Sequence, residues 1–166
     1  LPTSADALPY LRDESIRELF KRTNVFSPVE LESRFEVYAE QYILSIEVEA
    51  KLVIEMAKTM IYPAATQYLG ELSMTCSGMS DLGIEMDNSI DSSIANETNA
   101  MIAAVAELSK AITKHDFDSI EAHMNYCAND IHTLMDKVRA HVDALETEVA
   151  DDLWPLPKYR EMLFIK

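Results

Sequence analysis

Apolar residues recur at helical spacing along residues 27–72, the most regular pattern in the chain. Ser27 can cap such a helix, Pro28 can hold its first position without losing a hydrogen bond, and Glu30 can bond back to the Ser27 backbone. The apolar positions form two adjoining faces, one with Leu31, Phe35, Tyr38, Tyr42, Leu52 and Met56, the other with Ala39, Ile43, Ile46, Ala50, Val53, Ala57 and Met60. We therefore expect one long helix that its neighbours cover on most of its circumference.

Pro63 interrupts this pattern, but Ala64, Ala65 and Leu69 continue it, so we expect a kink rather than a stop. The helix is expected to end at Gly70 or within residues 73–80 (SMTCSGMS), a run that indicates a loop or a frayed helix end, with a boundary near Leu82.

Two later seams of apolar residues, with gaps of mostly three and four, predict helices that begin near residue 90 and near Asp116 or Asp118, the second ending near Val149. The seams are Ile94, Thr98, Met101, Val105, Leu108 and Ile112, and then Ile120, Met124, Cys127, Ile131, Leu134, Val138 and Leu145. A short helix can start at Asp13 or Ser15 and run to about Arg22. The predicted fold class is all-α, an elongated antiparallel bundle of three long helices plus a short N-terminal helix.

This pattern suggests three parts along the chain. Residues 1–12 contain Pro2 and Pro9 and lack a helical period, so they are predicted to form an extended arm from an upstream domain. Residues 13–152 would form the helical bundle, and residues 153–166 an aromatic C-terminal docking tail. The chain also begins without Met, as expected of a fragment of something longer.

Composition narrows the function classes. The formal net charge of −15 over 166 residues argues against nucleic acid or an anionic membrane as a partner. Cys76 and Cys127 form no CxxC motif, and the sequence has no signal peptide and no apolar run of about 18 residues. A cytoplasmic location fits these features.

Candidate chemistry is sparse. His115, His123, His132 and His141 lie eight or nine residues apart, about 12 Å or more along a helix, so neighbours cannot share one ion. No Glu-x-x-His pair and no Gly-rich phosphate loop occurs, and Cys127 falls on an apolar seam, where an inert thiol is expected. We therefore assign no catalytic, cofactor-binding or metal-binding residue.

An acidic stretch leaves two interpretations open. No Lys or Arg occurs between Lys58 and Lys110, while residues 71–107 carry seven acidic side chains among many Ser, Thr and Asn. A solvated, mobile tip of the bundle is one interpretation, and an acidic site for a cation or a partner is the other.

Three stretches resemble a known family. They are residues 1–9 (LPTSADALP), 25–36 (VFSPVELESRFE) and 153–164 (LWPLPKYREMLF), and together they look like the C-terminal region of type III glutamine synthetases. The resemblance implies a helical appendage of an enzyme that joins glutamate and ammonia with ATP and magnesium. It also implies two partners, the upstream catalytic domain and neighbouring subunits of a homo-oligomer. No position here matches the catalytic residues of that family.

The tail is the predicted docking element, and its expected partner is the helical base of this domain together with the upstream catalytic core. Pro155 and Pro157 hold it extended, so its large apolar residues cannot be buried by a helix of its own. The docking residues are Leu153, Trp154, Leu156, Tyr159, Leu163 and Phe164. The alternative is a stand-alone helical sensor or adaptor, with a small ligand or a protein partner bound in a cavity between its helices.

Overall fold

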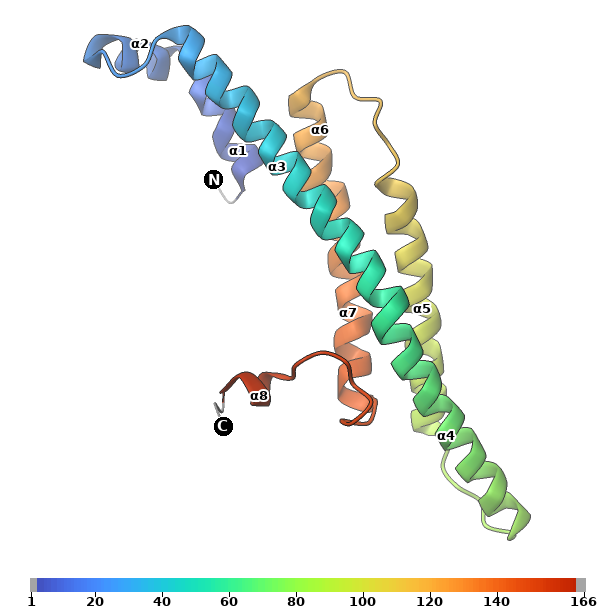
Figure 1. Ribbon diagram of the computed structural model, residues 1–166. Coiled ribbons are helices and arrows are strands. Elements are labelled where there is room, and N and C mark those ends of the chain that lie inside the picture. Colours follow the sequence, from blue (N-terminus) through green and yellow to red (C-terminus); the bar gives the residue numbers. More distant parts are fainter. Residues whose placement is uncertain (1–2, 164–166) are drawn as a thin grey trace. The chain divides into compact units, whose positions relative to one another are not determined.

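A computed structural model describes residues 3–163, apart from the side chains of Tyr159 and Arg160, and the prediction of an all-α fold is confirmed because these residues form helices and no strand (Figure 1). A short N-terminal helix and three long helical stretches are present, as predicted. The α-helices are α1 Ser4–Ala7, α2 Glu14–Thr23, α3 Pro28–Met56, α4 Tyr62–Asp81, α5 Ser89–Ala111, α6 Ile120–Tyr126, α7 His132–Glu148 and α8 Tyr159–Leu163. A 3-10 helix spans Leu8–Arg12, and π-helical turns span Ala57–Ile61 and Cys127–Ile131.

The predicted capping box starts α3. The Ser27 backbone N–H donates to Glu30 Oε2 at 2.7 Å, and the Glu30 N–H donates to Ser27 Oγ at 3.3 Å. The helix then continues through Pro63 into α4, as expected. A widened π turn directly precedes the proline, and a turn of this kind accommodates a backbone position that cannot donate the regular bond.

Gly70 and residues 73–80 were expected to end the helix, with a boundary near Leu82. The helix runs through all of them to Asp81, with Leu82 as its C-cap, so the boundary is confirmed and the loop over residues 73–80 is not. Gly70 and Gly78 stay in the helix, each at a cost of about 1 kcal/mol relative to Ala, which tertiary packing can override. The helix ends where Gly83 adopts φ +75° and two backbone bonds close the last turn, from Gly83 N to Ser80 O at 2.9 Å and from Ile84 N to Met79 O at 3.0 Å.

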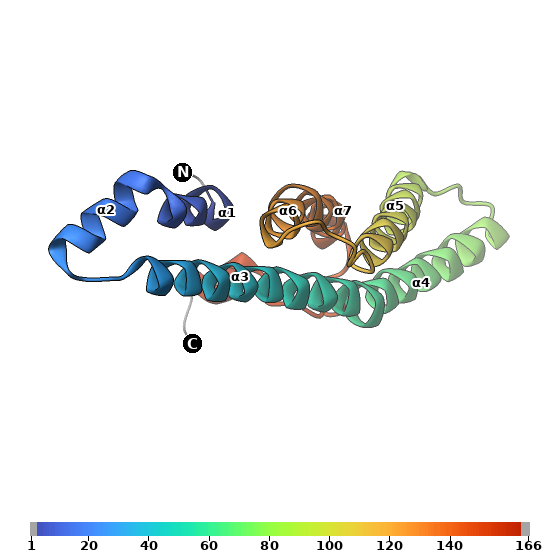
Figure 2. The ribbon, with the colours of Figure 1, turned by 90° about the horizontal axis from the view of Figure 1, so that it is seen from above.

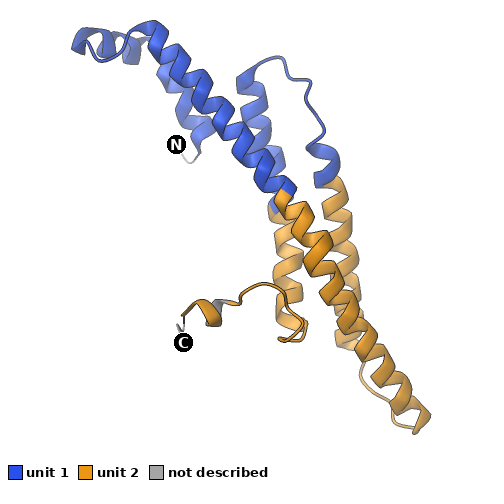
Figure 3. Cartoon of the chain, viewed as in Figure 1, with its two compact units in different colours: residues 1–51, 108–135 blue, residues 52–107, 136–166 orange. Residues whose placement is uncertain are grey.

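The chain divides into two compact units, coloured separately in Figure 3. Unit 1 consists of Leu1–Lys51 and Leu108–Met135, and unit 2 consists of Leu52–Glu107 and Asp136–Lys166. Each unit has its own apolar core.

The core of unit 1 lies between α3, the end of α5, and α6 with the π turn that follows it. Its buried side chains include Leu31, Phe35, Ala39, Ile43, Ile46, Ala50, Leu108, Met124, Cys127 and Ile131. Most of these positions belong to the predicted seams. The last long helical stretch begins at Ile120, slightly later than the expected start at Asp116 or Asp118. Ser119 is its N-cap, because Ser119 Oγ accepts a hydrogen bond from Ala122 N at 3.1 Å.

The described part of the arm, residues 3–12, is helical rather than extended, which corrects the sequence expectation. Thr3 and Asp6 form a capping box that starts α1, and Pro9 sits in the first turn of the 3-10 helix, where its missing N–H is tolerated. The arm lies along the beginning of α3 and against α6 (Figure 2), and Ala5 is buried. The helix α2 agrees with prediction: Asp13 caps it and Asn24, at φ 53°, ends it.

The core of unit 2 lies between α4, α5 and α7. Its buried side chains are Ala57, Ile61, Ala64, Ala65, Ile94, Thr98, Met101, Ala104, Val105, Val138, Leu145, Val149 and Trp154. The chain turns from α4 into α5 through residues 82–88, which are all exposed. This turn and the helix ends beside it form a tip at one end of the α4–α5 pair (Figure 1).

Candidate docking surfaces

Trp154 anchors the tail on unit 2. It exposes only 7% of its surface, and the backbone N–H groups of Leu153 and Trp154 both donate to Ala150 O at 3.1 Å, which turns the chain at the end of α7. Pro155 and Pro157 then prevent the helix from continuing. The large apolar side chain is therefore buried against this chain's own helices, and its Nε1 has no hydrogen-bond partner among the described residues.

A second attachment holds the chain after the prolines. Lys158 Nζ lies 3.0 Å from Asp151 Oδ1, and the Lys158 backbone N–H donates to Glu161 Oε2 at 3.0 Å, at the start of α8. Two described apolar side chains beyond this point are exposed, Leu163 to 68% and Met162 to 60%. The tail is thus buried at Trp154 and exposed at Met162 and Leu163.

The side chains of four of the six predicted docking residues are described, and they differ in burial. Trp154 is buried, Leu153 and Leu156 are half-buried, and Leu163 is exposed. The backbone of Tyr159 belongs to α8, but its side chain lies outside the described residues, as does Phe164. Their role in docking stays a prediction.

A second apolar surface runs along α3 within unit 1, and the sequence analysis missed it. Val37, Leu44 and Val48 are 55%, 60% and 61% exposed, and they follow one side of the helix with Gln41 between them. The spacing of seven and four residues is that of a helix face that packs on another element. We name Val37, Gln41, Leu44 and Val48 the α3 stripe.

The stripe has an acidic border. A shallow groove along it is lined by the stripe residues together with Ser45 and two carboxylates, Glu40 and Glu49. The expectation that neighbours cover most of α3 is therefore wrong: the buried positions occupy one side, and Tyr38 and Leu52, assigned to the covered faces, are exposed. The signal was present in the sequence as a third apolar line that the two assigned faces left out.

A charged network fixes the arm and α2 against α3 in unit 1. Arg12 pairs with Glu32 and, at 2.8 Å, with Glu121, while its guanidinium carbon lies 3.8 Å from the centre of the Phe35 ring. Arg17 pairs with the other oxygen of Glu32 at 2.7 Å. The hydrogen bond to Glu32 raises the pKa of Arg12, and the same bond lowers the pKa of Glu32. These contacts position the arm rather than form a reactive centre.

Two of the four histidines lie beside a carboxylate, and the other two are exposed. His123 Nε2 lies 3.4 Å from Glu47 and its ring stacks on Phe117, and His141 Nδ1 lies 2.8 Å from Glu97. His115 and His132 are exposed. Within residues 3–163, apart from the two side chains left undescribed, no three His, Cys, Asp or Glu side chains are grouped so that they could hold a metal ion.

The two cysteines differ in environment. Cys127 is buried, and desolvation, with a smaller effect of Glu47, raises the pKa of its thiol to about 11. The prediction that Cys127 is buried is confirmed. Cys76 is half-buried at the α4–α5 interface of unit 2, with Sγ 3.5 Å from Asp91 Oδ2, and burial also raises the pKa of its thiol.

Among the described helices, none is long and apolar enough to cross a membrane.

Comparison with known proteins gives one family. Residues 1–80 match the family model of the glutamine synthetase C-terminal domain. The whole chain is 30% identical to a type-3 glutamine synthetase of Dictyostelium discoideum and covers 24% of its length. Glutamine synthetases of Bacteroides fragilis (strain YCH46) and Butyrivibrio fibrisolvens are 28% and 27% identical over 97% and 96% of the chain, and each is covered to 23%. The chain thus spans about a quarter of the length of the curated relatives it matches.

Proposed function

Since this chain belongs to the C-terminal domain family of glutamine synthetases, we propose that it is the docking and assembly domain of such an enzyme and holds none of its active site. The enzyme as a whole would ligate glutamate and ammonia to glutamine with ATP and magnesium. Its partners would be the upstream catalytic domain and neighbouring subunits of a homo-oligomer, in the cytoplasm.

The distribution of chemical groups supports a non-catalytic role. The described residues include no grouping of metal ligands, and the sequence has no Gly-rich phosphate loop. The ATP and magnesium sites are therefore assigned, as part of this proposal, to the three quarters of the enzyme that this chain does not cover.

One observation carries the docking role: the α3 stripe presents apolar side chains that no described residue of unit 1 covers. Fully burying an exposed Val or Leu contributes roughly 1.5–3 kcal/mol, so covering the exposed part of Val37, Leu44 and Val48, somewhat over half of each, would contribute about 3–5 kcal/mol. Apolar surface of this kind marks a protein interface. The open end of the tail, at Met162 and Leu163, offers a second, smaller contact on unit 2.

The test uses the complete enzyme, produced from the full reading frame that contains this chain. Leu44→Asp/Val48→Asp places two charges on the stripe without changing any proposed catalytic group. We expect loss of assembly in sedimentation velocity and, with it, loss of glutamine formation, since two carboxylates would have to be desolvated in the contact.

A matched control adds the same charge elsewhere. Asn99→Asp/Asn125→Asp changes two exposed helical positions outside the stripe and should leave assembly and activity as in the wild type. If the stripe variant assembles and turns over like this control, the docking role of α3 is wrong.

A further inference from the structure

We propose that the α4–α5 tip of one copy of this chain binds in the hollow beside α2 of a second copy. The proposal goes beyond the assembly role above because it concerns a contact that this chain can make by itself. It rests on two surfaces with exposed apolar side chains and opposite charge, one in each unit.

The tip combines exposed apolar side chains with carboxylates. Leu82 is 75% exposed and Ile84 48% exposed, and Met74, Met86 and Ile90 are also exposed around the same turn. Leu82, Ile84 and Met86 alternate along the backbone with Gly83 and Glu85, in the non-helical segment between the two helices. All three apolar side chains are exposed, so they can be buried together by a partner.

The tip is also strongly negative. Asp81, Glu85 and Asp87 have no ion-pair partner among the described residues, and no Lys or Arg occurs from residue 59 to residue 109. Because the local charge has one sign, an apolar partner surface must be bordered by cations to bind here.

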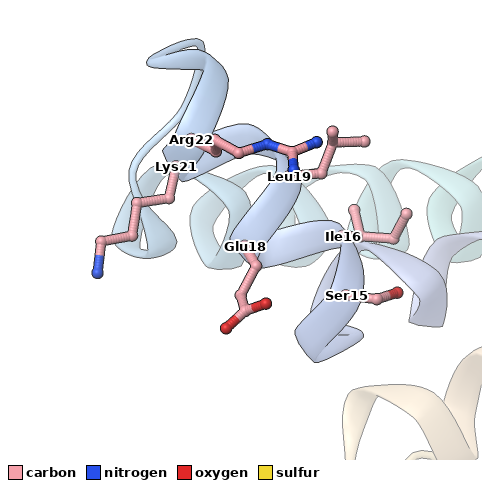
Figure 4. A pocket seen from close by; sticks show the side chains of 6 residues that line it. All are labelled: Ser15, Ile16, Glu18, Leu19, Lys21 and Arg22. Atoms are coloured by element: carbon pink, nitrogen blue, oxygen red, sulfur yellow. The ribbon is translucent and has the colours of Figure 1, made fainter.

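The hollow beside α2 meets this requirement (Figure 4). It has a volume of about 750 Å³ and is lined by Ser15, Ile16, Glu18, Leu19, Lys21 and Arg22. Leu19 and Ile16 are the apolar residues of this lining. Figure 4 shows the Arg22 side chain extending beside Leu19, while Lys21 points away on the other side. Glu18 is the one carboxylate in this lining, so the two cations leave the border positive.

The cations of the hollow are available for a partner. Arg12 and Arg17, the preceding arginines, are engaged with Glu32, whereas Lys21 and Arg22 are exposed and form no ion pair within the described part of the chain. They lie beside Leu19, which is 42% exposed, in a chain whose net charge is −15. A second copy supplies a matching negative, apolar element in its own tip.

The tip and the hollow are different surfaces, and each copy carries one of each. The same pairing can therefore be made twice in a two-fold dimer or once with each neighbour in a ring or a longer assembly.

Charge reversal tests the pairing directly. The hollow variant is Lys21→Glu/Arg22→Glu and the tip variant is Glu85→Lys/Asp87→Lys. Each variant alone brings like charges together, and we expect its self-association to weaken about ten-fold or more relative to wild type in sedimentation velocity at low salt. An equimolar mixture restores opposite charges at both possible contacts, and association should return.

Three further measurements close the test. Lys58→Glu/Lys110→Glu makes the same charge change at exposed positions outside both surfaces and should associate like the wild type. Ile84→Ser removes apolar area without a charge and should weaken association at high salt as well as low salt. Circular dichroism should show wild-type helix content in every variant, since all substituted side chains are exposed.

The proposal is overturned if the wild-type chain stays monomeric up to millimolar concentration, or if either charge-reversed variant associates like the wild type. It is also overturned if both variants lose association but the mixture does not regain it. None of these results bears on the α3 stripe, whose test is made on the complete enzyme.

Discussion

Trp154 offers the sharpest test of how the tail is held. In Trp154→Ala the buried indole is lost from unit 2, where it exposes only 7% of its surface. A buried aromatic side chain removes about 150–250 Å² from water, which at about 25 cal/mol per Å² gives an upper bound near 4–6 kcal/mol.

The buried indole N–H reduces the loss of stability expected for Trp154→Ala. Trp154 Nε1 is buried without a described hydrogen-bond partner, and leaving such a donor unsatisfied costs about 1–3 kcal/mol. We therefore expect Trp154→Ala to reduce the free energy of unfolding of unit 2 by about 2–3 kcal/mol. Trp154→Phe keeps most of the area and removes the unpaired donor, so it should change stability by less than about 1 kcal/mol.

Urea unfolding and hydrogen exchange of the isolated chain test this prediction. Trp154 is the only tryptophan, so its fluorescence follows this site during urea unfolding of the wild type, and circular dichroism compares the three proteins. Hydrogen exchange over residues 150–158 shows whether the tail detaches in Trp154→Ala. If Trp154→Ala is as stable as Trp154→Phe and exchanges equally slowly, the tail is not anchored by this side chain and the argument fails.

Three other predictions concern the chemistry of the chain. At pH 8 a thiol reagent should modify Cys127 much more slowly than Cys76, because Cys127 is buried with a pKa of about 11, and equal rates would contradict its burial. Glu32→Gln should reduce stability at neutral pH and make the loss of stability in acid less steep. A carboxyl whose pKa is lowered on folding stabilises the folded chain above its ordinary pKa of about 4.3. It loses that contribution as the pH falls through its lower folded pKa. If Glu32→Gln loses stability in acid as steeply as the wild type, the Arg12–Glu32–Arg17 network does not contribute to that loss. The purified chain should form no glutamine from glutamate, ammonia, ATP and magnesium, and turnover that persists through purification would refute the docking-domain proposal.

Local signals in the sequence predicted most of the helices correctly. The Ser27–Glu30 box and the Asp13 cap fixed two helix starts, and the seams through Met101 and Met124 identified the core, because burial requires apolar residues at helical spacing. The continuation of α4 through residues 73–80 was missed for an equally local reason. Gly70 and Gly78 are compatible with helix when no residue there adopts a left-handed backbone, and Gly83 is the glycine that does.

What packs outside the core was harder to predict. A periodic apolar pattern on α3 does not say which of its sides has a neighbour, so Val37, Leu44 and Val48 could not be recognised as uncovered. The tail was predicted to dock on the helical base of this domain and on the upstream catalytic core, and its composition could not say that its largest residue, Trp154, is the one buried on its own unit. Both outcomes depend on contacts between distant parts of the chain, which local spacing does not encode.

Direct binding between this chain and the rest of its enzyme tests the central claim. The two pieces would be produced separately from one reading frame and titrated against each other by isothermal calorimetry. We predict a saturable complex that Leu44→Asp/Val48→Asp weakens at least ten-fold and Asn99→Asp/Asn125→Asp does not change. A wild-type titration without binding, or equal binding by the stripe variant, would contradict the account of this chain as a domain that docks through α3.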